Sequence, residues 1–184
     1  AQYSFYPQTV SSIEPAGGSF FESTVVTVYG FFFPGFDGLE GSARCKFGDQ
    51  LSTPDTLDAR DGRIVCSSPT RADSAARTDA GGAGFEDLPF SVALNTVDFV
   101  GNDNITFRFY DHFLASISPQ GGHLQGNTYL LISGDRFNLL ELVQPTSRSL
   151  VRCRFGTHAA VSGTLVTQVG GLVSISCASS NSET

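Results

Sequence analysis

Short stretches of alternating apolar and polar residues, separated by turns rich in glycine, proline and asparagine, recur along the whole chain. Residues 23–30 (STVVTVYG) and 127–134 (NTYLLISG) are rich in β-branched and aliphatic side chains, and residues 43–47 (ARCKF) and 151–155 (VRCRF) alternate. A period of two predicts half-buried strands, here with Cys and Phe pointing inward and Arg and Lys outward. About seven short strands in about 100 residues are typical of an immunoglobulin-like sandwich. The pattern therefore predicts an all-β fold.

This pattern occurs twice. Residues 3–33 align without a gap on residues 107–137, and ten positions are identical, among them a Pro-x-Gly-Gly turn and a later glycine. That later glycine, Gly30 or Gly134, is expected where the backbone bends or takes a positive φ at the end of a strand. The two copies are offset by 104 residues, which is about the size of one small β-domain. A repeat of this length predicts a tandem pair of immunoglobulin-like β-sandwiches. Arrays of small modules usually bind other molecules, act as spacers or form assemblies.

The repeat predicts domain boundaries. Residues 7–110 form the first domain, and residues 111–184 form a second domain that lacks a counterpart of the hairpin at 89–110. Residues 1–6 (AQYSFY) match the last strand of a preceding repeat. Two explanations stay open: a window cut from a longer array, or head-to-tail assembly, in which one chain's N-terminal strand completes another chain's second domain. Both explanations predict that the functional unit, whether a longer protein or an assembly, is larger than this one chain.

Composition and charge argue against several classes of function. The net charge is −7 and Lys and Arg form no cluster, so we expect no nucleic-acid partner. No apolar run approaches the ~18 residues of a membrane span. The three histidines are scattered and no nucleophile motif occurs, so we expect neither an enzyme nor a cofactor. The acidic segment at 55–61 lacks a calcium-loop spacing, and we interpret it as a solvated loop.

The four cysteines fall two per repeat, at equivalent places. Three pairings are possible, and the repeat favours Cys45 with Cys66 and Cys153 with Cys177 over crossed pairs or free thiols. The spacing is not that of a zinc or redox motif. Two disulfides indicate an oxidising compartment. Asn104 begins the sequon Asn-Ile-Thr in a predicted turn between strands, where a glycan could be attached.

Aromatic residues stand in the first repeat where the second has polar ones. We interpret them, together with aromatics of residues 1–6, as an interdomain or intersubunit interface. The predicted interface residues are Phe21, Phe31, Phe32, Tyr3 and Phe5.

The order of these motifs resembles that of the IPT/TIG family. The resemblance rests on the SIxPxGG turn, the CxFG segment and the FxFY strand, and it covers nearly the whole chain twice. It implies two early-set immunoglobulin-like sandwiches without catalytic residues, and the paired cysteines resemble the extracellular branch of the family.

The predicted function is that of a non-catalytic structural or adhesive repeat segment of a long extracellular or cell-surface protein. We expect its partners to be neighbouring repeats or copies of itself, with possible glycans, assembled end to end or into a filament. The alternative is a ligand- or carbohydrate-binding receptor module that uses the variable loops at residues 34–42, 70–87 and 138–150.

Overall fold

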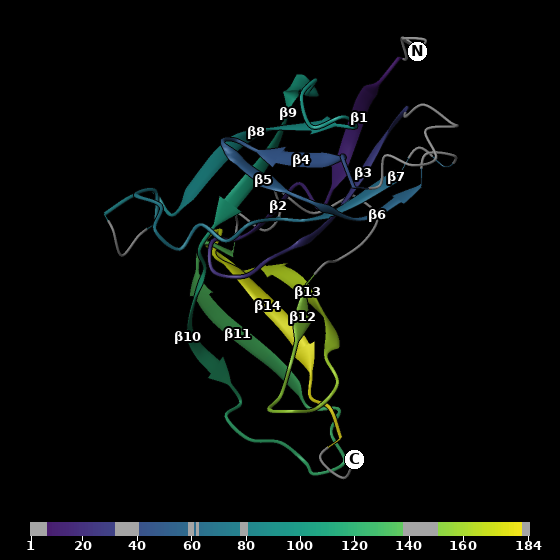
Figure 1. Ribbon diagram of the computed structural model, residues 1–184. Coiled ribbons are helices and arrows are strands. Elements are labelled where there is room, and N and C mark those ends of the chain that lie inside the picture. The colour runs from purple at the N-terminus through teal and green to yellow at the C-terminus, as the bar shows by residue number, and fades with distance from the viewer. Residues whose placement is uncertain are drawn as a thin grey trace, which may run out of the picture. The chain divides into compact units, whose positions relative to one another are not determined.

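The computed structural model describes residues 7–31, 41–58, 61, 63–77, 81–137 and 151–181, and it divides the chain into two compact units, residues 1–111 and 112–184. Every element that lies wholly within these described residues is a strand (Figure 1). The predicted all-β, immunoglobulin-like class is confirmed. Along the described stretches, no helix has the length and apolar character needed to cross a bilayer.

The part of unit 1 that the structure describes forms two sheets. The first has the order β1-β3-β7-β6 and is antiparallel throughout, and the second has the order β2-β9-β8-β4-β5. In the second sheet only β2 and β9 run parallel (Figure 1). The strands are β1 (Thr9–Glu14), β2 (Gly17–Ser19), β3 (Val25–Phe31), β4 (Arg44–Phe47), β5 (Gln50–Ser52), β6 (Pro54–Asp58), β7 (Arg63–Ser67), β8 (Phe85–Ala93) and β9 (Val100–Tyr110).

The core of unit 1 is aromatic. Val26 of β3 is fully buried, as the period of two predicts, and the ring of Phe47 on β4 contacts the rings of neighbouring strands edge to face. Its centroid lies 5.0 Å from that of Phe90 and 5.1 Å from that of Phe107, and the Phe107 and Phe109 rings are 4.9 Å apart. Phenylalanines of β4, β8 and β9 therefore fill the space that the two sheets enclose.

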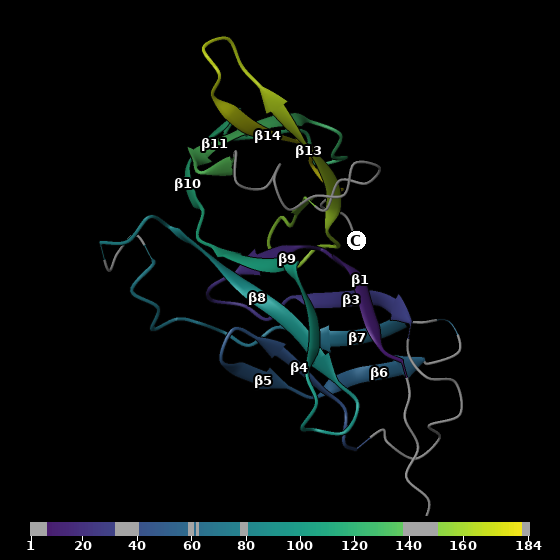
Figure 2. The same ribbon diagram turned by 90° about the horizontal axis from the view of Figure 1, so that it is seen from above.

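The β8–β9 hairpin differs from the prediction. The sequence placed Asn104 in a turn between strands, at residues 101–104, but β9 already begins at Val100 and runs beside β8 (Figure 2). The turn precedes Val100, because the side-chain oxygen of Asn95 accepts hydrogen bonds from the backbone N–H groups of Val97 and Asp98. Residues 102–105 instead form an irregularity inside β9, where the register shifts.

The described residues of unit 2 form one five-stranded antiparallel sheet of order β10-β11-β14-β13-β12. The register of β10 with β11 repeats that of β1 with β3, including the irregularity after Leu114, which corresponds to Val10. The sequence repeat is therefore also a repeat of strand pairing. The strands are β10 (Phe113–Ser118), β11 (Tyr129–Asp135), β12 (Arg152–Cys153), β13 (Val161–Thr167) and β14 (Val173–Ala178).

Close packing explains two repeated glycines. A Cβ on Gly122 would lie 2.5 Å from the Thr128 hydroxyl oxygen, and the same pair recurs in unit 1. Gly134 does not have the positive φ that we considered. A Cβ there would come within 2.0 Å of the Phe113 carbonyl oxygen and 2.6 Å of the Phe137 ring. Gly134 is thus required by the close approach of neighbouring groups.

Candidate functional site

The sheet of unit 2 presents apolar side chains that unit 1 buries. Val10 and Ile13 of β1 are 5% and 9% exposed, whereas their counterparts Leu114 and Ile117 of β10 are 58% and 43% exposed. Among the described residues of unit 2, no second sheet faces this one. We call the surface formed by Leu114 and Ile117 of β10 the open face. Exposed apolar surface of this kind is typical of protein contact sites.

In unit 1 the corresponding surface is covered by the end of β9. This strand runs parallel to β2, with Arg108 beside Gly17 and Phe109 beside Gly18. The N–H of Arg108 donates to the carbonyl oxygen of Ala16 at 2.9 Å. Phe109 is fully buried. The cover in unit 1 therefore combines parallel strand pairing with alternate aromatic side chains that enter the core.

Each unit contains one disulfide. Cys45 of β4 is bonded to Cys66 of β7, which joins the two sheets of unit 1. Cys153 of β12 is bonded to Cys177 of β14, and these strands lie on either side of β13. The second bond passes over Gly163, where a Cβ would lie 2.6 Å from the Cys177 sulfur. Glycine at this position makes room for the disulfide.

The family model of the IPT/TIG domain matches residues 8–109. The chain belongs to the IPT/TIG domain family. The match spans the strands of unit 1, and the resemblance recognised in the repeated motifs is confirmed. No curated protein matches the sequence.

Solved structures share the fold. A structure of the full extracellular region of plexin A4, domains 1 to 10, is 16% identical with a TM-score of 0.60, and the similarity covers 97% of this chain and 13% of that one. A second plexin A4 structure, with domains 1 to 8, is 18% identical with a TM-score of 0.56, and it covers 96% of this chain and 16% of that one. The chain thus spans less than a fifth of either plexin chain.

The predicted interface residues of this IPT/TIG protein lie partly on its surface. Phe21 is 50% exposed and Phe31 is 52% exposed. The guanidinium of Arg77 lies 4.6 Å from the Phe21 ring centroid, so this ring already has a cation–π contact. Tyr3, Phe5 and Phe32 lie outside the described residues. An interface role for these aromatics stays a prediction.

The predicted glycosylation site lies in β9 and not in a turn between strands. Asn104 is exposed, within the irregular part of the strand, and its N–H donates to the side-chain oxygen of Asn102 at 3.1 Å. The position is accessible to solvent, and attachment of a glycan stays a prediction.

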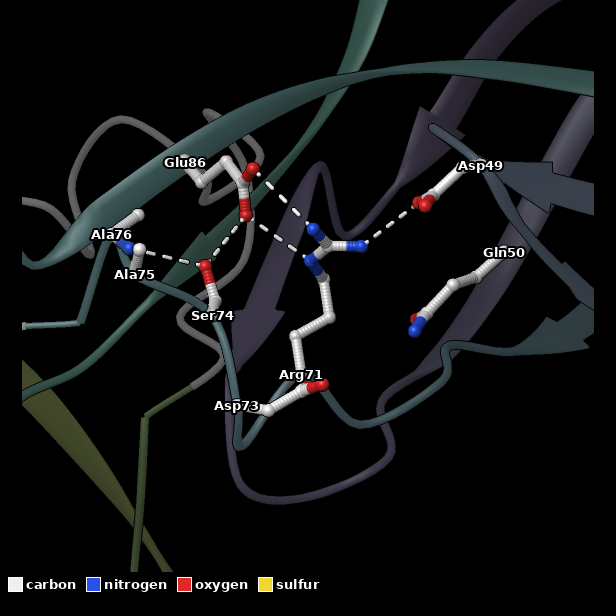
Figure 3. Close-up of a pocket in the computed structure, with 8 residues that line it drawn as sticks. All are labelled: Asp49, Gln50, Arg71, Asp73, Ser74, Ala75, Ala76 and Glu86. Carbon is white, nitrogen blue, oxygen red and sulfur yellow. Dashed lines mark hydrogen bonds and ion pairs between the residues drawn. The ribbon is translucent and has the colours of Figure 1, made fainter. Parts of the chain in front are cut away.

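A polar pocket of about 370 Å³ lies beside the segment that follows β7. Figure 3 shows Arg71 between two carboxylates, 3.1 Å from Asp49 and 3.1 Å from Glu86, while Ser74 donates to Glu86 at 3.0 Å. These groups largely satisfy one another, so the network holds the segment against β8. The side-chain oxygen of Gln50 is buried in this wall without a protein partner. The pocket is lined by Asp49, Gln50, Arg71, Asp73, Ser74, Ala75, Ala76 and Glu86.

Two residues at the end of β9 have shifted acid–base behaviour. The hydrogen bond with Asp87, at 2.6 Å, raises the pKa of Arg108 and outweighs the lowering effect of burial. Burial raises the pKa of Tyr110 to about 12. Within the described ranges, no group of three or more His, Cys, Asp or Glu side chains is arranged to hold a metal ion.

Proposed function

We propose that this chain is a non-catalytic structural or adhesive repeat segment of a long extracellular or cell-surface protein, in which IPT/TIG units assemble end to end or into a filament. The observation that carries the proposal is the open face of unit 2. Leu114 and Ile117 are exposed there at positions where the first unit has a buried core. Burial of such side chains against another chain or repeat provides the free energy of assembly.

Two further features support an extracellular place for this assembly. Both units contain a disulfide, and disulfides persist in oxidising compartments. Asn104 offers an exposed sequon on the surface of β9. A disulfide cross-link in each unit suits a load-bearing or spacing role.

Sedimentation velocity across a wide concentration range, with negative-stain microscopy of the same samples, tests the proposal. We expect particles larger than the 19.5 kDa single chain, with a mass that grows with concentration. Because the open face is apolar, the association should persist in 0.5 M salt, whereas purely electrostatic contacts would weaken. A dispersed 19.5 kDa particle at every concentration contradicts the proposal.

A second candidate is recognition of a polar ligand, including carbohydrate, by the variable loops. The observation that favours it is the buried, unpartnered oxygen of Gln50 in the wall of the polar pocket. The described part of the loop at 70–87 borders this pocket, and residues 34–40 and 138–150 lie outside the described residues. Saturation-transfer NMR with a panel of sugars tests it, with Gln50→Leu as the pocket variant. Absence of transfer from every sugar, or equal transfer in the variant, contradicts this candidate.

A further inference from the structure

We propose that Asn104 is an N-linked glycosylation site built into a bulge of β9, and that its glycan covers the outer edge of this strand at residues 100–107. We call these residues the free edge of β9. A glycan there prevents other chains from adding a strand to unit 1 at this place. The proposal rests on the extracellular location in the proposed function, which the two disulfides support.

The sequon lies where β9 has more residues than its partner strand. The register of β9 with β8 is regular as far as Thr106 and again at Gly101, and the residues between them lie opposite Phe90 alone. Phe90 is buried in the core. A Cβ on Gly101 would lie 2.7 Å from the carbonyl oxygen of Phe90, so the two strands are in close contact beside the bulge. The extra residues therefore extend out of the ladder.

The bulge directs both side chains of the sequon to solvent. Ile105 is partly buried against the core of unit 1, whereas Asn104 and Thr106 on either side of it are exposed. The amide that receives the sugar and the hydroxyl that completes the sequon therefore lie on the same outer face. The N–H of Asn104 donates to the side-chain oxygen of Asn102 at 3.1 Å, which holds the backbone of the sequon.

The edge of β9 beside the bulge has no strand partner among the described residues. β2 pairs with β9 only from Arg108 to Tyr110, and the strand order of the sheet places no other described strand on this side. Residues 100–107 are therefore at the edge of the sheet. The unpaired backbone groups of such an edge are a template for a strand from another chain.

The other strand edges of unit 1 have protection of their own. β5 has three residues, and β1 has an irregular register after Val10. β6 begins with Pro54, which has no N–H to donate, and continues with the charged Asp55. Short strands, bulges, proline and charge all hinder edge pairing. The free edge of β9 is longer than any of these strands, and a glycan gives it a comparable protection.

Glycosylation at this position is a simple group transfer. The side-chain nitrogen of Asn104 attacks C1 of a sugar carried on a lipid diphosphate. The new C1–N bond replaces the C1–O bond to the phosphate, the lipid diphosphate leaves with the bonding electron pair, and the amide nitrogen loses one proton. The secretory pathway supplies the lipid-linked sugar, and nothing is oxidised or reduced.

The modification is tested on the 184-residue chain secreted from eukaryotic cells behind a secretion signal. Peptide-N-glycosidase removes the glycan and converts the modified asparagine to aspartate, so mass spectrometry of peptides locates it. We expect Asn104 to be modified in the parent protein and in Thr106→Ser, which keeps the sequon, and to be unmodified in Thr106→Ala. Thr106 is exposed, so both variants should fold, which far-UV circular dichroism checks.

The covering of the edge is tested by sedimentation velocity of the same two variants, each combined with Leu114→Asp to remove association through the open face. We expect Thr106→Ala to associate at a concentration at least about tenfold lower than Thr106→Ser. Asn104→Gln, which removes the sequon at its other end, should match Thr106→Ala. Hydrogen–deuterium exchange of residues 100–107 should slow in the associated protein, which locates the contact at the free edge.

The outcomes separate this inference from the proposed function. Secreted protein that has both disulfides but an unmodified Asn104 overturns the inference and leaves the proposed function standing. A modified Asn104 with equal association of Thr106→Ala and Thr106→Ser overturns the covering role of the glycan. Protein that stays inside the cell with free thiols contradicts the extracellular location, and the proposed function fails with it.

Discussion

The disulfide of unit 2 leads to a prediction about Gly163. A Cβ at this position would lie 2.6 Å from the Cys177 sulfur, 2.9 Å from a Val151 methyl carbon and 3.3 Å from the Cys153 sulfur. All three neighbours are buried, so they can yield only by shifting the sheet. Overpacking of this kind costs about 1–3 kcal/mol, and the smaller conformational freedom of alanine in the unfolded chain returns about 0.4–1 kcal/mol. We expect Gly163→Ala to destabilise unit 2 by about 1–2 kcal/mol.

The assay must report on unit 2 alone. Hydrogen–deuterium exchange of peptides from β13 and β14 gives the free energy of opening of this sheet, and urea unfolding followed by circular dichroism gives the global value. Gly121→Ala is the matched control, because a Cβ at Gly121 meets nothing within 4 Å. Its effect should lie within about 0.5 kcal/mol. Both proteins are compared at a concentration below that of assembly.

A double-mutant cycle shows whether the disulfide is the cause. In the Cys153→Ala/Cys177→Ala background the two sulfurs are absent, so the cost of Gly163→Ala should fall to less than half. An unchanged cost in that background would assign the effect to Val151 or to the backbone. If Gly163→Ala and Gly121→Ala prove equally harmless in the parent protein, the close-approach argument is refuted.

Three further predictions concern unit 1, each measured by urea unfolding. Arg71→Leu should cost about 1–2 kcal/mol because its side chain is 15% exposed and its loss leaves the partly buried carboxylate of Glu86 without its charged partner, whereas Arg63→Leu, at a pair about half exposed, should cost less than about 0.5 kcal/mol. Burial holds the pKa of Tyr110 at about 12, above the unfolded value near 10, so stability should fall by about 1.4 kcal/mol per pH unit between those values, and Tyr110→Phe should remove that slope. Gly18→Ala should cost at least about 1–3 kcal/mol, because its Cβ would lie 2.1 Å from a threonine oxygen, whereas Gly41→Ala, in open space, should be neutral.

Strand pairing was the part of the fold that the sequence made predictable. Because side chains alternate with a period of two, aligned repeats must place Val28 and Ile132 on the same face, and the observed registers agree. The turn of the β8–β9 hairpin was misplaced because residues 101–104 resemble a turn in composition. The side chain of Asn95 forms the turn earlier, and the Gly-Asn-Asp-Asn stretch becomes an irregularity within β9.

The candidate sites were less predictable. The sequence shows that Leu114 matches Val10, but the exposure of one and the burial of the other depend on a second sheet, which periodicity does not reveal. The reason for Gly163 was also hidden, because it depends on a disulfide between strands that flank its own. The network of Arg71 joins residues far apart along the chain, and no motif marks it.

The apolar side chains of β10 connect the exposure measured in unit 2 with the proposed assembly. Two residues separate β10 from Tyr110, the last residue of β9. The β10 side chains Leu114 and Ile117 are exposed at positions that are buried in β1 of unit 1. Assembly through these side chains should therefore slow hydrogen–deuterium exchange of β10, and equal exchange in associated and dispersed protein would argue against contact at the open face.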